Sequence, residues 1–157
     1  MTLENWVKNS WLERRDSDAP EVARLLAIAD GRLKDYQGAI VAKLSSDVQL
    51  VLAYDAIRAC STAALRAAGY RVVRGGNEHY RTIEALEFSI DPEKKLIPML
   101  DKLRKKRNIG SYDDYGLVSQ SDADQCGKMA VRVRKEVEDW IRKNHADKIA
   151  SGEPPKK

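Results

Sequence analysis

The sequence predicts an all-α protein that forms a single-domain bundle of four to six helices. Three observations predict this fold class. Apolar residues recur at helical spacings of three and four, no segment alternates apolar and polar residues as a half-buried strand does, and good capping residues stand where helices would begin. A length of 157 residues is also ordinary for one domain.

The N-terminal half contains three candidate helices. A short first helix falls within residues 1–19 and includes Leu3, Trp6, Val7 and Trp11. The second begins near Pro20, because proline suits the first turn of a helix. Its apolar stripe consists of Val22, Leu25, Ala29, Leu33, Tyr36, Ile40 and Leu44. The third follows the capping residues Ser45, Ser46 and Asp47, and its stripe consists of Val48, Leu52, Ala56, Ala59, Ala63 and Ala67.

Three further helices are expected after the glycine-containing stretch RVVRGGN, which indicates a loop. The fourth covers residues 78–90, and the fifth contains Leu96, Leu100 and Leu103 in line. The last begins at Ser121, after a loop over 111–120. Its apolar face consists of Cys126, Met129, Val133, Val137, Trp140 and Ile141. We therefore expect a bundle over 20–144 and a disordered tail over 145–157.

Composition and charge exclude several classes of protein. No segment approaches the roughly 18 uninterrupted apolar residues of a membrane span, and the N-terminus carries charges where a signal peptide is apolar. The sequence thus predicts a cytoplasmic protein without a membrane partner. Cys60 and Cys126 lack Cys or His neighbours at metal spacing, so we expect small core residues and neither a metal site nor another cofactor.

The basic run over residues 102–107 is the most informative stretch, since every residue in it except Leu103 is basic. It comprises Lys102, Arg104, Lys105, Lys106 and Arg107. The lysines are expected to point mostly outward, either as a solvated face or as contacts to RNA phosphates. Arg107 instead continues the apolar stripe of the fifth helix. A guanidinium group there needs an acid, a carbonyl or a ligand phosphate.

Three further residues could support Arg107. His79 lies one turn before Ile83 on an apolar face, which is compatible with a structural histidine or with a proton carrier. Asp55 and Arg58 are three residues apart, so they can form an ordinary ion pair along one helix. Alternatively, Asp55 faces the bundle and positions Arg107 or Tyr112.

Arg107, Asn108 and Tyr112 form the pattern RN-x3-Y, which resembles the signature motif of the HEPN family. That motif is an arginine, a polar residue, a short spacer and a histidine at the start of the last core helix. The stretches AYDAIRACSTAAL (53–65) and EHYRTIEAL (78–86) also resemble one bacterial HEPN subgroup. The resemblance covers residues 20–143, with its first two helices matching by pattern only.

The resemblance implies a helical bundle whose homodimer brings two motifs to one cleft, where many members cut RNA without a metal. In that reaction the ribose 2′-hydroxyl attacks the adjacent phosphate, which requires a cation and proton carriers. Arg107 would supply the cation and Asn108 would orient the phosphate. Tyr112 stands where many members have histidine, and a phenol with a pKa of about 10 is a poor base at pH 7. His79 is the better proton carrier, and Tyr115 is a further candidate contact to RNA.

Two functions follow from the resemblance. The first is a HEPN-like RNA-binding protein that acts as a metal-independent endoribonuclease in a toxin–antitoxin or defence system, with a cognate antitoxin as partner. The alternative is a non-catalytic HEPN-fold module that binds a nucleic acid, a nucleotide or a protein. Some family members work beside a nucleotidyltransferase that modifies a tyrosine, for which Tyr112 and Tyr115 are candidates. A purely structural helical adaptor would leave the position of Arg107 unexplained.

Overall fold

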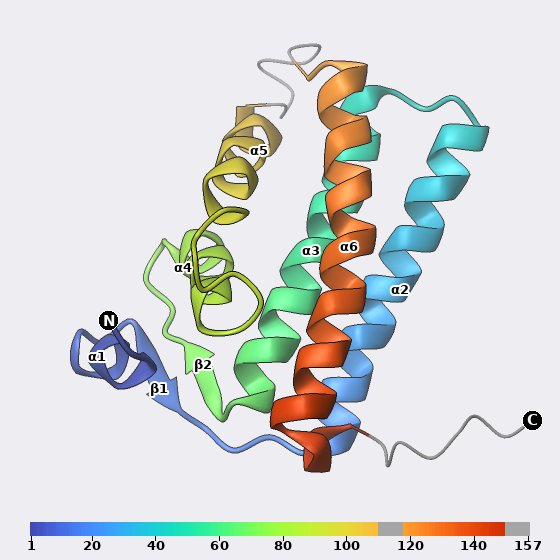
Figure 1. The fold of residues 1–157 in the computed structure, drawn as a ribbon. Helices are drawn as coiled ribbons and strands as arrows, with labels where there is room; N and C mark the ends of the chain where they lie inside the picture. The colour runs from blue at the N-terminus through green and yellow to red at the C-terminus, as the bar shows by residue number, and fades with distance from the viewer. Residues whose placement is uncertain (110–117, 150–157) are drawn as a thin grey trace, which may run out of the picture.

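The computed structural model describes residues 1–109 and 118–149, which form an all-α bundle with one small two-stranded sheet (Figure 1). The three long helices, α2 (Ala19–Val41), α3 (Ser46–Ala67) and α6 (Gln120–Asn144), lie side by side. The shorter helices α4 (Glu78–Glu84) and α5 (Ile97–Ile109) pack against α3. The prediction of a single-domain helical bundle is confirmed.

Side-chain caps explain where the long helices begin. The Asp18 carboxylate accepts a hydrogen bond from the backbone N–H of Glu21, and Ser45 caps α3 in the same way. The N-cap of α6 is Ser119, two residues before the predicted Ser121. Ser119 is favoured because Asp122 completes a capping box with it, and this reciprocal pair satisfies two backbone donors.

The core centres on α3, whose small side chains allow α2 and α6 to approach closely. Ala53, Ala56 and Ala63 are fully buried there. The predicted stripe of α2 is correct as far as Tyr36, but Ile40 and Leu44 are 44% and 48% exposed. The last turns of α2 tilt away from α6 (Figure 1), so these side chains have no helix to pack against. Val48, expected on the stripe of α3, is likewise exposed.

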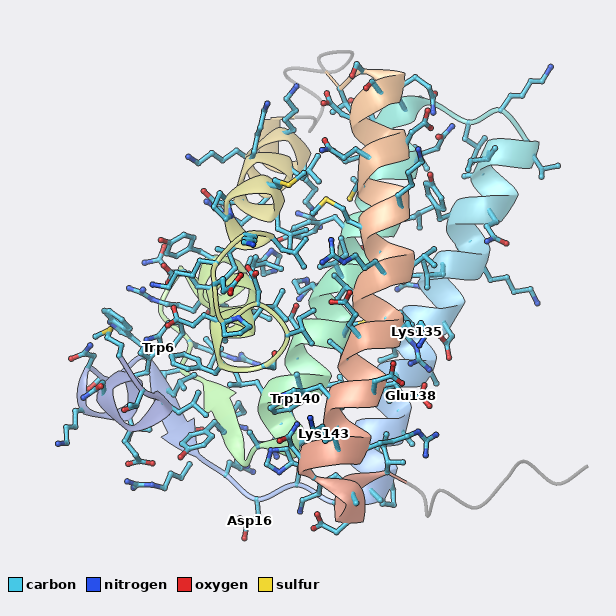
Figure 2. The ribbon with its side chains drawn as sticks, viewed as in Figure 1. Trp6, Asp16, Lys135, Glu138, Trp140 and Lys143 are labelled. Atoms are coloured by element: carbon cyan, nitrogen blue, oxygen red, sulfur yellow. The ribbon has the colours of Figure 1, made fainter. Side chains whose placement is uncertain are left out.

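The N-terminal segment corrects two predictions. Helix α1 (Leu3–Lys8) ends before Trp11, because Ser10 adopts a left-handed φ of 64° that turns the chain. Strand β1 (Leu12–Arg14) then pairs antiparallel with β2 (Tyr70–Val72), which lies in the stretch predicted to be a loop. Trp6, labelled in Figure 2, packs edge-on against Trp11 and Phe88 and lies in a cluster with Leu12 of β1 and Leu65 of α3. This corner therefore has a small aromatic core of its own.

The fourth predicted helix is shorter than expected. Helix α4 ends at Glu84 and continues only as a 3-10 turn, η1 (Ala85–Phe88). Asp91 then accepts backbone hydrogen bonds from Lys95, Leu96 and Ile97, at distances of 2.8–2.9 Å. Because these N–H groups precede or open α5, the buried Asp91 carboxylate fixes the direction in which α5 leaves.

The chain continues as ordered structure beyond α6, contrary to the expected tail over 145–157. A 3-10 turn, η3 (Ala146–Lys148), leads to Ile149, which is buried against the main core. His145 is half-buried beside the ring of Trp140, with the ring centroids 5.0 Å apart. The predicted disorder of 150–157 concerns residues outside those described. No helix in the described ranges is long and apolar enough to cross a membrane.

Both cysteines are buried core residues, as predicted. Cys60 and Cys126 are fully buried and free. Burial raises the pKa of each thiol to about 12, so neither forms a reactive thiolate near neutral pH. Their positions on the facing helices α3 and α6 make them packing residues.

Candidate functional site

Arg107 lies in the last turn of α5 and reaches across to Asp55 on α3. The distance from Arg107 Nη2 to Asp55 Oδ1 is 3.6 Å, which is an ion pair but too long for a good hydrogen bond. The guanidinium also lies 5.8 Å from the centre of the Tyr54 ring. Asp55 forms no ion pair with Arg58 within the described residues, so the ordinary i,i+3 pair is replaced by the contact to α5.

Four buried side-chain polar atoms in residues 1–109 and 118–149 lack a hydrogen-bond partner. They are Tyr54 Oη, Asp55 Oδ1, Arg58 Nε and Arg107 Nε. We call these four residues the polar cluster. Buried polar groups are nearly always paired, and leaving one unpaired costs roughly 1–3 kcal/mol. Because all four atoms belong to one cluster, the cost is concentrated where Arg107 meets α3.

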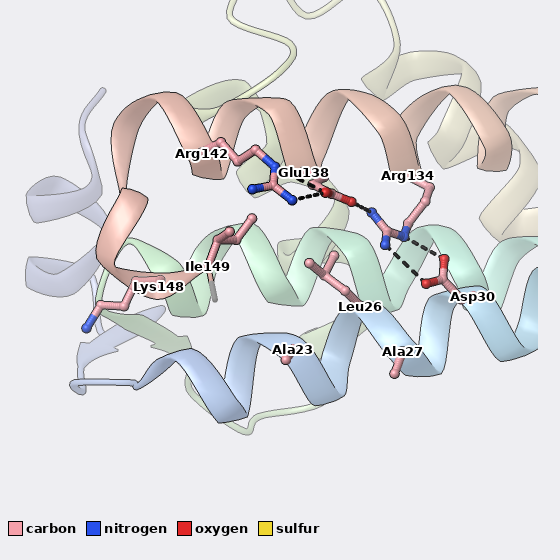
Figure 3. A pocket seen from close by; sticks show the side chains of 9 residues that line it. All are labelled: Ala23, Leu26, Ala27, Asp30, Arg134, Glu138, Arg142, Lys148 and Ile149. Atoms are coloured by element: carbon pink, nitrogen blue, oxygen red, sulfur yellow. Dashed lines mark hydrogen bonds and ion pairs between the residues drawn. The ribbon is translucent and has the colours of Figure 1, made fainter. Parts of the chain in front are cut away.

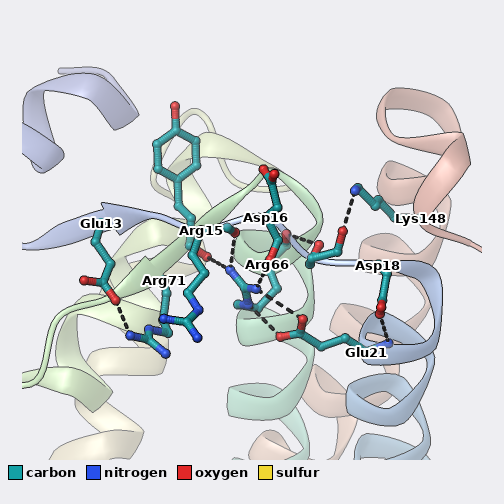
Figure 4. A network of polar contacts seen from close by, with 10 residues as sticks. Glu13, Arg15, Asp16, Asp18, Glu21, Arg66, Arg71 and Lys148 are labelled. Atoms are coloured by element: carbon teal, nitrogen blue, oxygen red, sulfur yellow. Dashed lines mark hydrogen bonds and ion pairs between the residues drawn. The ribbon is translucent and has the colours of Figure 1, made fainter.

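Arg66 provides a contrast within the same helix (Figure 4). Its guanidinium group is buried and donates two hydrogen bonds to the Glu21 carboxylate. Its remaining donors bind the backbone oxygens of Arg15, Asp16 and Tyr70. Because all of its N–H groups are hydrogen-bonded, Arg66 joins the segment from Arg15 to Glu21 to the C-terminal end of α3. Its role is structural, unlike that of an arginine with a buried Nε left unpaired.

Arg134 gives a second contrast, in a pocket of about 220 Å3 between α2 and α6 (Figure 3). It donates to Asp30 and to Glu138, and Glu138 also accepts from Arg142. The charged groups around Arg134 are therefore paired with one another. We therefore assign this paired network to stability.

His79 lies at the start of α4, close enough to the polar cluster for its charges to act on the imidazole. Burial is the main cause that lowers the His79 pKa, and the positive charges of Arg58 and Arg107 lower it further. Asp55 opposes this effect more weakly. The imidazole is therefore neutral at pH 7 and able to accept a proton. Thus Arg107, Asp55 and His79, which sequence reasoning grouped together, lie in one region.

Tyr54 was not identified from the sequence as a site residue. Burial raises the pKa of its hydroxyl to about 12, so the group remains a hydrogen-bond donor at neutral pH. The only signal in the sequence is its position next to Asp55. Arg58 was expected to support the site, yet its buried unpaired Nε makes it a second candidate ligand for an anion.

The basic run is partly occupied by ion pairs. Lys102 is exposed, whereas Arg104 binds Asp101 at 2.8 Å and Lys105 lies 3.5 Å from the same carboxylate. Arg104 also lies 5.3 Å from the centre of the Tyr80 ring. The outward orientation expected for the lysines does not hold for Lys106, whose side chain turns toward α6.

Lys106 donates to Asp122 at 2.8 Å and so joins α5 to the capping box of α6. Its side chain is one third exposed, so it is less available to RNA than Lys102 or Lys105. Ser46 of α3 also donates to the backbone oxygen of Val118 at 2.7 Å. These contacts join α5 to the first turn of α6, and Val118 to the first turn of α3.

Several predicted site residues fall outside the described structure. Asn108 belongs to α5, but its side chain is not described, and Tyr112 and Tyr115 lie in the undescribed range 110–117. The position of Arg107 also differs from the HEPN pattern. It stands at the end of α5, whereas the last helix begins only at Gln120.

Comparisons with known protein families, with curated proteins and with solved structures find no match. The HEPN resemblance stays a prediction, and the chemistry of the polar cluster is the basis for assigning a function. With the neighbouring His79 it combines two guanidinium groups, one carboxylate, a buried phenol and a neutral imidazole, and the side chains of Arg107 and Asp55 are partly exposed. Such a set can bind an anion and transfer a proton beside it.

Proposed function

We propose that the protein is a HEPN-like RNA-binding protein whose polar cluster binds an RNA phosphate. The observation that carries this proposal is the pair of buried, unpartnered Nε donors on Arg58 and Arg107. A phosphate oxygen is a strong acceptor with the geometry that a guanidinium fork prefers. The cluster holds two guanidinium groups and one carboxylate, Asp55, which among the described residues is paired with Arg107 only, so it keeps a net positive charge for an anion.

The surroundings of the cluster also favour a polyanion. Arg107 and Asp55 are 27% and 21% exposed, which leaves their charged ends reachable from solvent. Lys102 and Lys105 extend the positive surface along α5 and are themselves largely exposed. Such lysines contribute binding energy by releasing counterions from neighbouring phosphates.

The reaction that this site supports is metal-independent cleavage of RNA. The His79 imidazole takes the proton of the ribose 2′-hydroxyl, whose oxygen attacks the adjacent phosphorus. Arg58 and Arg107 stabilise the negative charge that develops on the phosphate oxygens. The leaving 5′-oxygen takes up a proton, for which Tyr112 is the proposed donor, and the product is a 2′,3′-cyclic phosphate. An activity of this kind fits the toxin of a toxin–antitoxin or defence system.

A non-catalytic binding module is the second candidate, and one observation favours it. The motif position where many HEPN members have histidine is Tyr112, whose ordinary pKa of about 10 makes it a poor base. Such a module would use the same cluster to hold an RNA or a nucleotide. It differs from the nuclease in its outcome, because the bound RNA stays intact.

The test is incubation of structured and unstructured RNA with the purified protein in the presence of a chelator. We expect cleavage products that end in a cyclic phosphate, and loss of both binding and cleavage in Arg107→Ala. Arg132→Ala is the matched control, since Arg132 forms an exposed i,i+4 ion pair on α6. Binding without cleavage would select the non-catalytic module. If the wild-type protein binds no RNA even at low salt, the proposal is wrong.

A further inference from the structure

A groove runs between α2 and α3 and opens next to the polar cluster. Its cavity measures about 230 Å3. Leu25, Ile28 and Arg32 line it from α2, and Asp55, Arg58, Ala59 and Thr62 line it from α3. Asp55 and Arg58 thus belong both to the polar cluster and to the wall of this groove.

The positions of the lining residues along their helices show which of them lie at each end of the groove. The residues from α2 follow at steps of three and four, and those from α3 lie three, four and seven positions after Asp55, so each set forms one stripe. Because the two helices are antiparallel and joined by a short turn, Arg32 comes level with Asp55 and Leu25 with Thr62. The groove therefore has a cationic end at the polar cluster and an apolar end one to two turns away.

The cationic end has capacity for an anion. The Arg32 guanidinium is 46% exposed, and its one ion pair in the described residues, to Asp35, is a surface contact at 3.6 Å. Exposed pairs of this kind contribute roughly 0–1 kcal/mol and are easily exchanged for another anion. Arg58 adds its unpartnered Nε, so two arginines and one carboxylate surround this end of the groove.

The apolar end has a partly exposed floor. Ile28 is 49% exposed although it lies between two packed helices, and Ala59 beneath it is 8% exposed. Thr62 borders the floor with a hydroxyl that donates to the backbone oxygen of Arg58 and keeps a lone pair free. An apolar surface beside a hydroxyl suits a flat, weakly polar ring better than another charged group.

We infer that this groove binds one nucleotide unit, with its phosphate at Arg58 and Arg32 and its base on Leu25, Ile28 and Ala59. The inference rests on the proposed function, because it places the nucleotide next to the phosphate held by Arg107. The cavity is smaller than the roughly 300–1,000 Å3 of typical drug-sized ligand sites, which limits it to a single unit. The unit can belong to an RNA chain or be a free nucleotide.

The test compares two probes, a fluorescent hexauridylate and UMP, on four variants of the full chain. Ile28→Asp places a carboxylate on the floor, and Val131→Asp is its control, because Val131 is a similarly exposed β-branched residue on α6. Arg32→Gln removes a guanidinium, and Arg24→Gln is its control on the exposed side of α2. Thermal melting of all four confirms folding, which these exposed positions should not impair.

We expect Ile28→Asp to weaken hexauridylate binding by about tenfold or more, because it removes an apolar contact to the base and puts a carboxylate near the phosphate. Arg32→Gln should weaken it severalfold, and both controls should remain within twofold of wild type. If Arg107→Ala abolishes RNA binding while Ile28→Asp and Arg32→Gln do not change it, the groove is not a subsite, although the proposed function stands.

UMP distinguishes the source of the nucleotide. Binding of UMP that depends on Ile28, without any binding of hexauridylate, would support the groove and overturn the RNA-binding function. Competition of UMP with hexauridylate in the wild type, abolished in Ile28→Asp, would support both. If neither probe binds the wild-type protein, both proposals are wrong.

Discussion

The arginines discussed above fall into two kinds, according to whether their N–H donors have hydrogen-bond partners within the fold. Arg66 has every donor direction satisfied inside the fold, whereas Arg58 and Arg107 each bury an Nε without a partner. A structural arginine stabilises the folded chain, while an arginine held for a ligand tends to cost stability until the ligand binds. The two classes should therefore respond in opposite ways to truncation.

Arg107→Ala should leave the melting temperature unchanged or raise it, because it removes a buried donor that has no hydrogen bond. Arg66→Ala should destabilise the protein by about 3–5 kcal/mol, since it leaves Glu21 and three backbone oxygens without their donor. Thermal and urea unfolding of both variants measure this. A large loss of stability in Arg107→Ala would make that residue a structural one.

His79 should make stability depend on pH. Its pKa lies below the ordinary 6.5 because of burial and the nearby arginines, so the unfolded chain binds its proton more readily. The resulting stability is complete above about pH 6.5 and is lost as the pH falls through the lower, folded pKa. His79→Gln should flatten the decline in unfolding free energy as the pH falls below about 6.5.

His145 is the internal comparison for that measurement, because burial lowers its pKa as well. His145→Gln should also flatten the decline in unfolding free energy at low pH, but it should leave any RNA cleavage intact. His79→Gln should flatten that decline and also remove the fall in cleavage rate at acidic pH. If cleavage by His79→Gln keeps the wild-type pH profile, His79 is not the base.

At the residue scale, the sequence could predict which side chains meet but not which remain unpaired. The stripe of α5 pointed Arg107 toward the bundle, and its contact with Asp55 agrees with that expectation. Whether the Nε of Arg58 finds a partner depends on how neighbouring helices pack around it. The helical spacing of one segment does not contain that information. Tyr54 was missed for the same reason, since it resembles any core aromatic.

The approach of α2 to α6 depends on one residue with no side chain. The Tyr36 ring of α2 lies over Gly127 of α6, and a Cβ at Gly127 would fall 2.0 Å from the Tyr36 hydroxyl oxygen. Tyr36 is buried, and its hydroxyl lies 3.5 Å from the backbone oxygen of Ala123. The two helices are therefore set at a distance that only glycine permits.

Gly127→Ala should destabilise the protein by about 1–3 kcal/mol, because the ring or the helix must move to avoid the added methyl group. Gly31→Ala on α2 is the matched control, since no atom lies within 4 Å of its added Cβ. It should stabilise the protein by about 0.4–1 kcal/mol through helix propensity. Urea unfolding of the pair tests both signs, and equal effects would contradict the packing argument.

Helix α5 should determine the salt dependence of RNA binding. Lys102 and Lys105 are exposed, whereas Lys106 is committed to Asp122 of α6. Replacing Lys102 and Lys105 with Gln should lower the slope of log affinity against log salt by roughly 0.7 for each phosphate that is no longer neutralised. Lys106→Gln should change the slope less and lower the melting temperature more. The reverse ranking would show that Lys106 is the main RNA-binding lysine.

At the element scale, predictions succeeded where local chemistry decides. Pro20 and Ser45 marked the starts of α2 and α3, because a fixed φ and a side-chain cap act within one turn. Strands β1 and β2 were missed because each has three residues and gains its stability from the other, 58 positions away at Glu13 and Arg71. Strand β1 contains a single apolar residue, Leu12, which is too few to show the alternation of a strand.

At the scale of the whole molecule, four exposed apolar side chains gather at the corner where α2 turns into α3. Val41 is 82% exposed, and Ile40, Leu44 and Val48 around it are each more than 40% exposed. Contiguous apolar surface of this kind commonly marks a contact between proteins. It lies at the same end of the bundle as the last turn of α5 and the first turn of α6 (Figure 1).

A homodimer is the expectation at this scale, because the HEPN resemblance implies a cleft completed by a second copy around a two-fold axis. Light scattering at micromolar concentration should give about twice the chain mass of 17.7 kDa. Val41→Asp should weaken self-association, since it places a charge in the apolar corner, while Val131→Asp on α6 serves as an exposed control. If dimer formation assembles the RNA site, Val41→Asp should also reduce RNA affinity without lowering the melting temperature of the monomer. A monomer of unchanged mass with and without RNA would remove the composite cleft and leave the polar cluster as a site within one chain.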